Sequence, residues 1–187
     1  MREIYLDNAA TTPMSPKVID VITDEMKNDF GNASSTYELG RQARNVIDRA
    51  RHQIAASINA KDNEIIFTSG GSESNNTAIF GTAYSRKNIG KKIITTQIEH
   101  PSVLNPMKRL EDEGYNVVYL NVDETGHISL DELKKELTPD TILVSIMAVN
   151  NEVGSIMPLK EIGELVKESN AYFHVDNVQG MGTIDID

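Results

Sequence analysis

The segment HVDNVQG, residues 174–180, places a carboxylate and an amide three positions apart directly after an apolar run. Asp176 should end a strand that is buried on both faces, where an unpaired carboxylate is costly unless a cation meets it. No Lys or Arg occurs after Lys167. Two explanations are therefore open: an ion pair with a distant arginine such as Arg41 or Arg44, or a cationic atom of a bound ligand.

A second unusual segment, FTSGGSESNNTAI, passes from a predicted strand into a predicted helix through Gly70 and Gly71. Ser72 then lies at the helix N-terminus among free backbone N–H groups, a geometry that can hold a phosphate. A plain tight turn with Ser72 as the N-cap explains the same residues equally well. The segment lacks the Lys of a P-loop and the spacing of a dinucleotide fingerprint, so any bound phosphate would belong to a smaller ligand.

Two further strand ends carry side chains that could do chemistry. His100 follows the run KIITT and stands directly before Pro101, which opens the next predicted helix. A lone His is more often structural than catalytic, although its position at a strand end favours function. Asn150 and Asn151 follow the most apolar run, in AVNNEVGS. Hydrogen bonds within a turn would readily account for Asn150. They account less well for two consecutive asparagines.

Alternating strand and helix patterns must position these residues. Runs rich in β-branched and aromatic residues predict five strands, near Ile65, Ile93, Val117, Leu143 and Phe173. Helical periodicity predicts helices among them, over residues 73–85, 102–113, 130–136 and 159–169. Strands separated by such helices require crossovers and a mostly parallel sheet that is covered on both faces. The sequence therefore predicts an α/β fold, with ligand-binding side chains gathered beyond the carboxyl ends of the strands.

Several helices carry recognisable start signals. Ser15 followed by Pro16 predicts the N-cap and first residue of an N-terminal helix. A long amphipathic helix is predicted from Glu38 to Asn59. Ser129 with Glu132 three residues later is typical of a capping box.

Composition excludes several classes of function. A length of 187 residues suits one domain, and a net charge of -10 argues against a nucleic-acid or anionic membrane partner. No apolar run approaches the length of a membrane span and the first residues lack a signal-peptide core, so we expect a cytoplasmic protein. The absence of Cys removes disulfides, thiolate metal sites and any cysteine nucleophile from these residues, and no metal site is predicted.

The strand ends together supply a phosphate cradle, an imidazole, an amide, and a carboxylate with a second amide. Pyridoxal phosphate requires such a set: a phosphate anchor, a flat side chain over the ring, a partner for the phenolic oxygen and an acid for the pyridine nitrogen. The residues therefore predict pyridoxal 5'-phosphate as the cofactor.

The sequence resembles the cysteine desulfurases, within the class-V aminotransferase-like enzymes. Six motifs occur in the order of that family: YLDNAATTP, GNASSTYELGRQAR, IIFTSGGSESNN, EHPSV, VNNEVG and HVDNVQ. The resemblance implies that Gly71 and Ser72 bind the cofactor phosphate. It also implies that His100 stacks on the ring and moves protons, that Asp176 pairs with the ring nitrogen, and that Gln179 bonds the phenolic oxygen.

Substrate contacts are also implied by the resemblance. Asn151 would approach the phenolic oxygen and the substrate carboxylate, and Ala10 with Thr11 would line the substrate entrance. The family usually has Thr at the position of Ser72, a change that keeps the hydroxyl. It commonly has Pro and His at the positions of Ala33 and Tyr37, which loosens the assignment to a subgroup.

The family's fold and mechanism set further expectations. Fold type I of the pyridoxal-phosphate-dependent transferases is implied, with residues 1–14 as an arm of the small domain and 15–187 as the first part of an incomplete large domain. The lysine that attaches the cofactor and the cysteine that accepts sulfur do not match any position here, so a chain of these 187 residues is expected to be inactive.

The intact enzyme would convert L-cysteine to L-alanine and pass sulfur, as a persulfide, to an iron–sulfur scaffold or a tRNA thiolation enzyme. A homodimer is implied as well. A selenocysteine lyase, a cysteine-sulfinate lyase and a non-catalytic binding module stay open as alternatives.

Overall fold

A computed structural model describes residues 4–185 of the chain. These residues form two compact units, 4–67 and 68–185. The division into an arm over 1–14 and a large domain over 15–187 stays a prediction. Residues 1–3 and 186–187 of those ranges lie outside the described residues.

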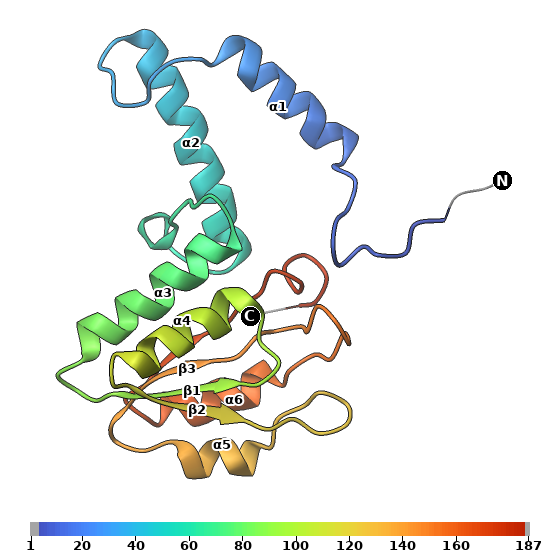
Figure 1. The fold of residues 1–187 in the computed structure, drawn as a ribbon. Coiled ribbons are helices and arrows are strands. Elements are labelled where there is room, and N and C mark those ends of the chain that lie inside the picture. Colours follow the sequence, from blue (N-terminus) through green and yellow to red (C-terminus); the bar gives the residue numbers. More distant parts are fainter. Residues whose placement is uncertain (1–3, 186–187) are drawn as a thin grey trace. The chain divides into compact units, whose positions relative to one another are not determined.

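The first unit contains two helices and a short 3-10 turn, which are α1 (Pro16–Asn28), α2 (Glu38–Ser57) and η1 (Asp62–Glu64). The predicted start of α1 is confirmed, because the hydroxyl of Ser15 accepts the Val18 N–H at 3.4 Å and Pro16 is the first helical residue. Figure 1 shows both helices as separate rods joined by a loop. The predicted helix from Glu38 to Asn59 is likewise confirmed, ending two residues earlier at Ser57.

The second unit alternates helices with strands. Its elements in chain order are α3 (Gly71–Arg86), β1 (Lys92–Thr96), α4 (Pro101–Asp112), β2 (Asn116–Leu120), α5 (Leu130–Glu136), β3 (Thr141–Ser145), α6 (Leu159–Lys167) and β4 (Tyr172–His174). The four strands form one sheet in the order β2-β1-β3-β4. Every pairing is parallel, so the carboxyl ends of all four strands meet at one edge.

Helices cover both faces of this sheet, as Figure 1 shows. On one face, Ile93 of β1 and Leu143 of β3 pack against apolar side chains of α3 and α4. On the other face, Ile94 and Val144 pack with side chains of α5 and α6. The neighbours Ile93 and Ile94, and likewise Leu143 and Val144, thus enter opposite cores, as the pleat of a buried strand predicts. The predicted α/β fold with a covered parallel sheet is confirmed.

The predicted strand near Ile65 is wrong. Residues 65–68 continue from η1 without strand structure, and Ile66 and Phe67 are exposed. Arg51 donates a hydrogen bond to the Ile65 carbonyl, and its guanidinium lies 4.7 Å from the centre of the Phe67 ring. A β-rich run becomes a strand only where another strand offers its backbone groups. Within residues 4–185 the four paired strands all lie elsewhere in the chain.

The remaining helices follow their local signals closely. Helix α5 begins and ends at the predicted residues, and the Ser129 hydroxyl accepts the Glu132 N–H at 3.3 Å. Across the described range, no helix combines the length and apolar character that crossing a lipid bilayer demands.

Candidate functional site

The candidate site lies at the carboxyl edge of the sheet, where the segments after β1, β3 and β4 meet the start of α3. After β3 and β4 the two chain segments stay paired, because Ile146 N–H donates to the His174 carbonyl and Ala148 N–H donates to the Asp176 carbonyl. An ideal Cβ atom added to Gly71 would lie 3.0 Å from the Val178 side chain. The segment after β4 therefore packs directly against the first residue of α3.

The start of α3 has the features of an anion cradle. Gly70 has a φ of +158°, a conformation that residues with side chains rarely adopt, and the space where a side chain would stand is open. The first α-helical hydrogen bond runs from Ser74 N–H to the Gly70 carbonyl, so the preceding N–H groups point out of the helix end. Ser72 is exposed beside them. This arrangement fits a phosphate.

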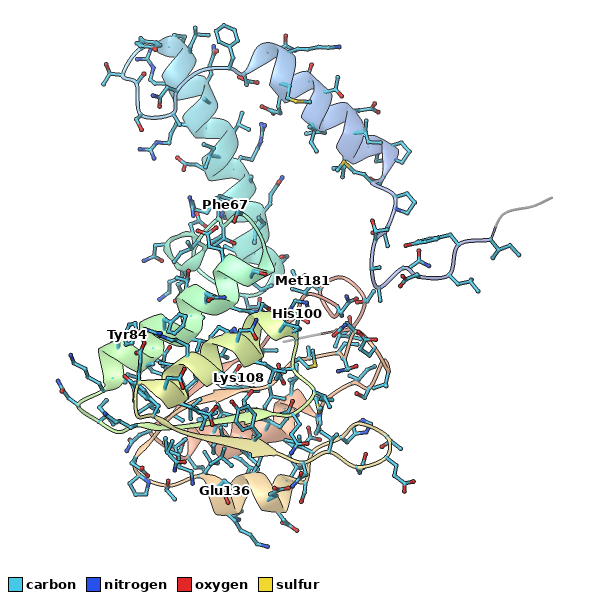
Figure 2. All side chains as sticks on the ribbon, viewed as in Figure 1. Phe67, Tyr84, His100, Lys108, Glu136 and Met181 are labelled. Carbon is cyan, nitrogen blue, oxygen red and sulfur yellow. The ribbon has the colours of Figure 1, made fainter. Side chains whose placement is uncertain are left out.

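His100 is the N-cap of α4, where Figure 2 labels it. Its Nδ1 accepts the Ser102 N–H at 3.1 Å and lies 2.8 Å from the Ser102 hydroxyl. Because Nδ1 accepts a backbone N–H, the proton of a neutral ring stands on Nε2. The imidazole is exposed, and its outer nitrogen is free of these cap contacts to meet a ligand.

A groove brings Ser72 and His100 to one surface. It encloses about 470 Å³ and is lined by Ser72, Asn76, Phe80, His100, Pro101, Ser102, Asn105, Pro106 and Arg109. The predicted phosphate anchor and the predicted imidazole thus share one groove between α3 and α4.

A chain of hydrogen bonds connects His100 to Asp176. The Asn75 amide donates to Asp176 Oδ2 at 2.8 Å and to the Ser102 hydroxyl at 2.9 Å, and that hydroxyl lies against the His100 ring. Asn75 is buried on α3 four residues before Ile79 and eight before Ala83, on the inward face of the helix. A polar residue at a position where the helical periodicity predicts a buried apolar one is the sequence signal that could have identified Asn75.

Asp176 is buried without a cation. Its side chain is 7% exposed, and its other oxygen, Oδ1, accepts the Val178 N–H at 3.1 Å. None of the four salt bridges among the described residues involves Asp176, and Arg41 pairs instead with Glu38. Arg41 and Arg44 both belong to the first unit, so the alternative of an ion pair between Asp176 and one of them stays open. A buried carboxylate that holds only neutral donors fits a cationic ligand atom.

Glu99 is a second buried carboxyl at this edge, which the sequence reasoning missed. Its Oε1 accepts the Thr96 hydroxyl at 2.8 Å and the Met147 N–H at 3.0 Å, whereas Oε2 is buried with no partner among the described residues. Burial is the main reason that the pKa of Glu99 rises to about 7, and the negative charge of Asp176 raises it further. The signal available in the sequence was an acid next to His100 at a strand end.

The two asparagines after β3 have different roles. Asn150 is buried; its amide donates to the Ile98 carbonyl at 2.9 Å, and its Oδ1 accepts the N–H groups of Glu152 and Val153. Asn151 is half-buried, and among the described residues its amide donates to the Glu152 carboxylate at 3.1 Å. Hydrogen bonds within the turn therefore account for Asn150. Asn151 could bind a ligand by giving up its exposed hydrogen bond to Glu152.

Replacing Asn150 with Ala is expected to lower the free energy of unfolding by about 2 kcal/mol, because one buried carbonyl and two turn N–H groups lose their partner. Asn151→Ala is the matched control and should change it by less than about 0.5 kcal/mol. Urea denaturation followed by circular dichroism measures both. Equal losses in the two variants would contradict the distinction.

The other predicted site residues lie as follows. Gln179 is half-buried in the turn after β4, directly after Val178, whose N–H donates to Asp176. Ala10 and Thr11 belong to the first unit, where the Ala10 N–H donates to Asp7 in a turn. Their place at a substrate entrance stays a prediction, as do the ligand roles of the residues at the sheet edge.

A parallel sheet with an anion cradle, an imidazole and a buried unpaired acid at its carboxyl edge defines the class of α/β proteins that bind phosphorylated cofactors there. The sequence pattern of the aminotransferase class-V family matches residues 4–187, and the chain belongs to this family. Members of the family and the cysteine desulfurases related to it depend on pyridoxal phosphate.

The chain is similar to named cysteine desulfurases. It is 51% identical over 187 residues to a protein called putative cysteine desulfurase IscS 1 from Bacillus subtilis (strain 168), covering 100% of this chain and 49% of that protein. It is 48% identical over 186 residues to cysteine desulfurase IscS from Methanosarcina thermophila, covering 100% of this chain and 46% of that protein. The chain therefore spans about half the length of the curated relatives it matches.

Solved structures show the same relationship. A NifS-like protein superposes with a TM-score of 0.92 at 38% identity, covering 95% of this chain and 50% of the other. A structure described as SspA in complex with cysteine superposes with a TM-score of 0.93 at 38% identity, covering 98% of this chain and 53% of the other.

Proposed function

We propose that this chain is the N-terminal part of a pyridoxal-phosphate-dependent cysteine desulfurase, which converts L-cysteine to L-alanine and transfers the sulfur to an enzyme cysteine. The observation that carries the proposal is Asp176, a buried carboxylate with neutral donors and no cation beside the open start of α3. The names of the relatives and the cysteine in the SspA structure support the substrate.

The residues present fit the cofactor. The free N–H groups at the start of α3, with the Ser72 hydroxyl, would hold the phosphate. Asp176 would hold a proton on the ring nitrogen, and the Asn75 amide keeps that carboxylate in place. Bound pyridoxal phosphate supplies an electron sink for negative charge that develops at the substrate α-carbon.

The other side chains would orient and exchange protons. His100 keeps its Nδ1 occupied by Ser102, so proton exchange with a ligand would occur at Nε2. Gln179 and Asn151 would bond the phenolic oxygen, and Asn151 the substrate carboxylate. Sulfur would leave the substrate by attack of a cysteine thiolate, and an iron–sulfur scaffold or a tRNA thiolation enzyme would receive it.

The test is to titrate the purified 187-residue chain with pyridoxal phosphate, and then to add L-cysteine. We expect saturable binding, seen as a change in the cofactor's visible absorbance, and no alanine, because these residues contain no Cys to accept sulfur. Pyridoxal, which lacks the phosphate, is the control ligand and should bind much more weakly. Absence of any saturable binding would refute the assignment of the cofactor site.

We also propose self-association, as a homodimer or a looser assembly in the cytoplasm. The outer edges of β2 and β4 are unpaired in the four-stranded sheet, and exposed edges favour pairing with another chain. Analytical ultracentrifugation should be run over a range of protein concentration of about 100-fold, which is wide enough to detect a weak dimer. The average molecular mass should rise with protein concentration. A constant monomer mass would count against the proposal.

A further inference from the structure

The site contains an acidic group that the roles above leave unused. Glu99 is 4% exposed and lies next to His100, yet its side chain points inward to Thr96 and Met147 and away from the groove-lining positions. One of its oxygens is buried and unpartnered among the described residues. A buried carboxyl in that state is costly as an anion and much less so as a neutral acid.

Glu99 and Asp176 are held on either side of the same two residues. The N–H of Met147 donates to Glu99 Oε1 at 3.0 Å, and the N–H of the next residue, Ala148, donates to the Asp176 carbonyl at 2.9 Å. The negative charge of Asp176 adds to the larger effect of burial in raising the pKa of Glu99. Neither carboxyl forms a salt bridge with a Lys, Arg or His in the part of the chain that the structure describes.

The other ionisable groups near the pair are two histidines. His174 of β4 is half-buried with Nδ1 against the Ser145 hydroxyl at 2.8 Å, and burial lowers its pKa, which favours the neutral ring. His100 at the start of α4 is exposed and uses Nδ1 as an acceptor. On α3, the side chain that meets Asp176 is the neutral Asn75.

We propose that Glu99 is a proton-bearing positioning residue coupled to Asp176: it holds a proton while Asp176 faces no cation, and releases it to solvent when a cationic group pairs with Asp176. The balance is simple. Before pairing, one carboxylate and one carboxylic acid carry a charge of about minus one; after pairing, two carboxylates and one cation carry the same net charge. A site of low dielectric constant favours keeping the net charge the same, because an added unbalanced charge is costly there.

The coupling has a structural consequence for His100. Glu99 ties the turn after β1 to the segment after β3 through Met147, and Asn150 ties the same two segments through the Ile98 carbonyl. A cation at Asp176 would therefore convert Glu99 into a charged, stronger acceptor for the Met147 N–H and the Thr96 hydroxyl. The turn that carries His100 would become more rigid when the site is filled.

The test is to follow the side-chain carboxyl carbons by NMR in the full chain labelled with 13C-glutamate, with Glu99→Gln used to assign the Glu99 signal. In the parent chain, Glu99 should titrate with a midpoint near 7, far above the ordinary glutamate value of 4.5. Asp176→Asn should lower the Glu99 midpoint by about half a unit, since one nearby negative charge is removed.

The second arm adds saturating pyridoxal phosphate and rests on the proposed function. Bound cofactor should lower the Glu99 midpoint by at most about half a unit in the parent chain, the limit set by removing the Asp176 charge, and leave it unchanged in Asp176→Asn. A Glu99 midpoint that ignores both Asp176→Asn and bound cofactor would overturn the coupling. If absorbance shows that the cofactor does not bind, the proposed function fails, and the Asp176→Asn arm alone decides the coupling. Asp176→Ser replaces Asp176→Asn if the latter does not give a folded spectrum.

Discussion

In equilibrium titrations with pyridoxal phosphate, the Asp176→Asn chain is expected to bind at least about 100-fold more weakly than the parent chain. Removing one member of a buried ion pair leaves the other charge uncompensated, which typically costs about 3 to 5 kcal/mol, and about 1.4 kcal/mol corresponds to a factor of ten. In the proposed complex the loss would fall on the pyridinium nitrogen, because Asn75 and the Val178 N–H are neutral donors that do not replace a carboxylate.

Asp140→Asn is the matched control, because Asp140 is an exposed carboxylate just before β3 at the opposite end of that strand. It removes the same charge from the chain, and we expect the affinity for pyridoxal phosphate to stay within about twofold of the parent. Circular dichroism should show that both variants are folded. Similar affinities for Asp176→Asn and Asp140→Asn would mean that Asp176 does not pair with the cofactor.

Glu99→Gln is expected to make the stability of the free chain less dependent on pH. The folded-state pKa of Glu99, about 7, lies above its ordinary value of 4.5, chiefly because the group is buried. The neutral acid is thus the form that the fold prefers, so its contribution is fully present below pH 4.5 and is lost as pH rises through 7. Glutamine cannot ionise and keeps an oxygen for the Thr96 and Met147 donors.

The parent chain should therefore lose about 2 to 3 kcal/mol relative to Glu99→Gln between pH 5 and pH 8, as a shift of one pKa unit corresponds to about 1.4 kcal/mol. Urea denaturation at both pH values measures the difference. Glu161→Gln, at an exposed position on α6, is the control and should follow the parent curve. Parallel pH dependences for the parent and Glu99→Gln would show that Glu99 does not titrate in this range.

The two variants also separate two effects at the same edge of the sheet. Asp176→Asn acts on ligand affinity, because its partner is a group that the free chain lacks. Glu99→Gln acts on the free chain itself, because its cost is desolvation that exists before any ligand binds. A cofactor that lowers the pKa of Glu99 by neutralising Asp176 would be bound more tightly at a pH where Glu99 is ionised than at a pH where it is protonated.

Local sequence signals determined most of the elements in this protein. Ser15 with Pro16 and Ser129 with Glu132 marked two helix starts correctly, because an N-cap hydrogen bond involves residues only three positions apart. The runs that became β1 to β4 are long enough in apolar, β-branched residues to be buried strands, and the helices between them imply parallel pairing. The rule that ligands meet the carboxyl ends of such strands then selected Ser72, His100, Asn151 and Asp176.

Only the tertiary structure decided which polar groups meet. Ile65 lies in a β-rich run that forms no strand, since pairing depends on a partner backbone far away in sequence. Asn75 reaches Asp176 across 101 positions of the chain, and Met147 reaches Glu99 across 48. Burial depends on how the helices pack on the sheet. The unpaired oxygen of Glu99 and the lack of a cation at Asp176 therefore cannot be predicted from the residues next to them in the sequence. Spacing along the chain sets which element a residue belongs to; desolvation and long-range contact set its charge and its partners.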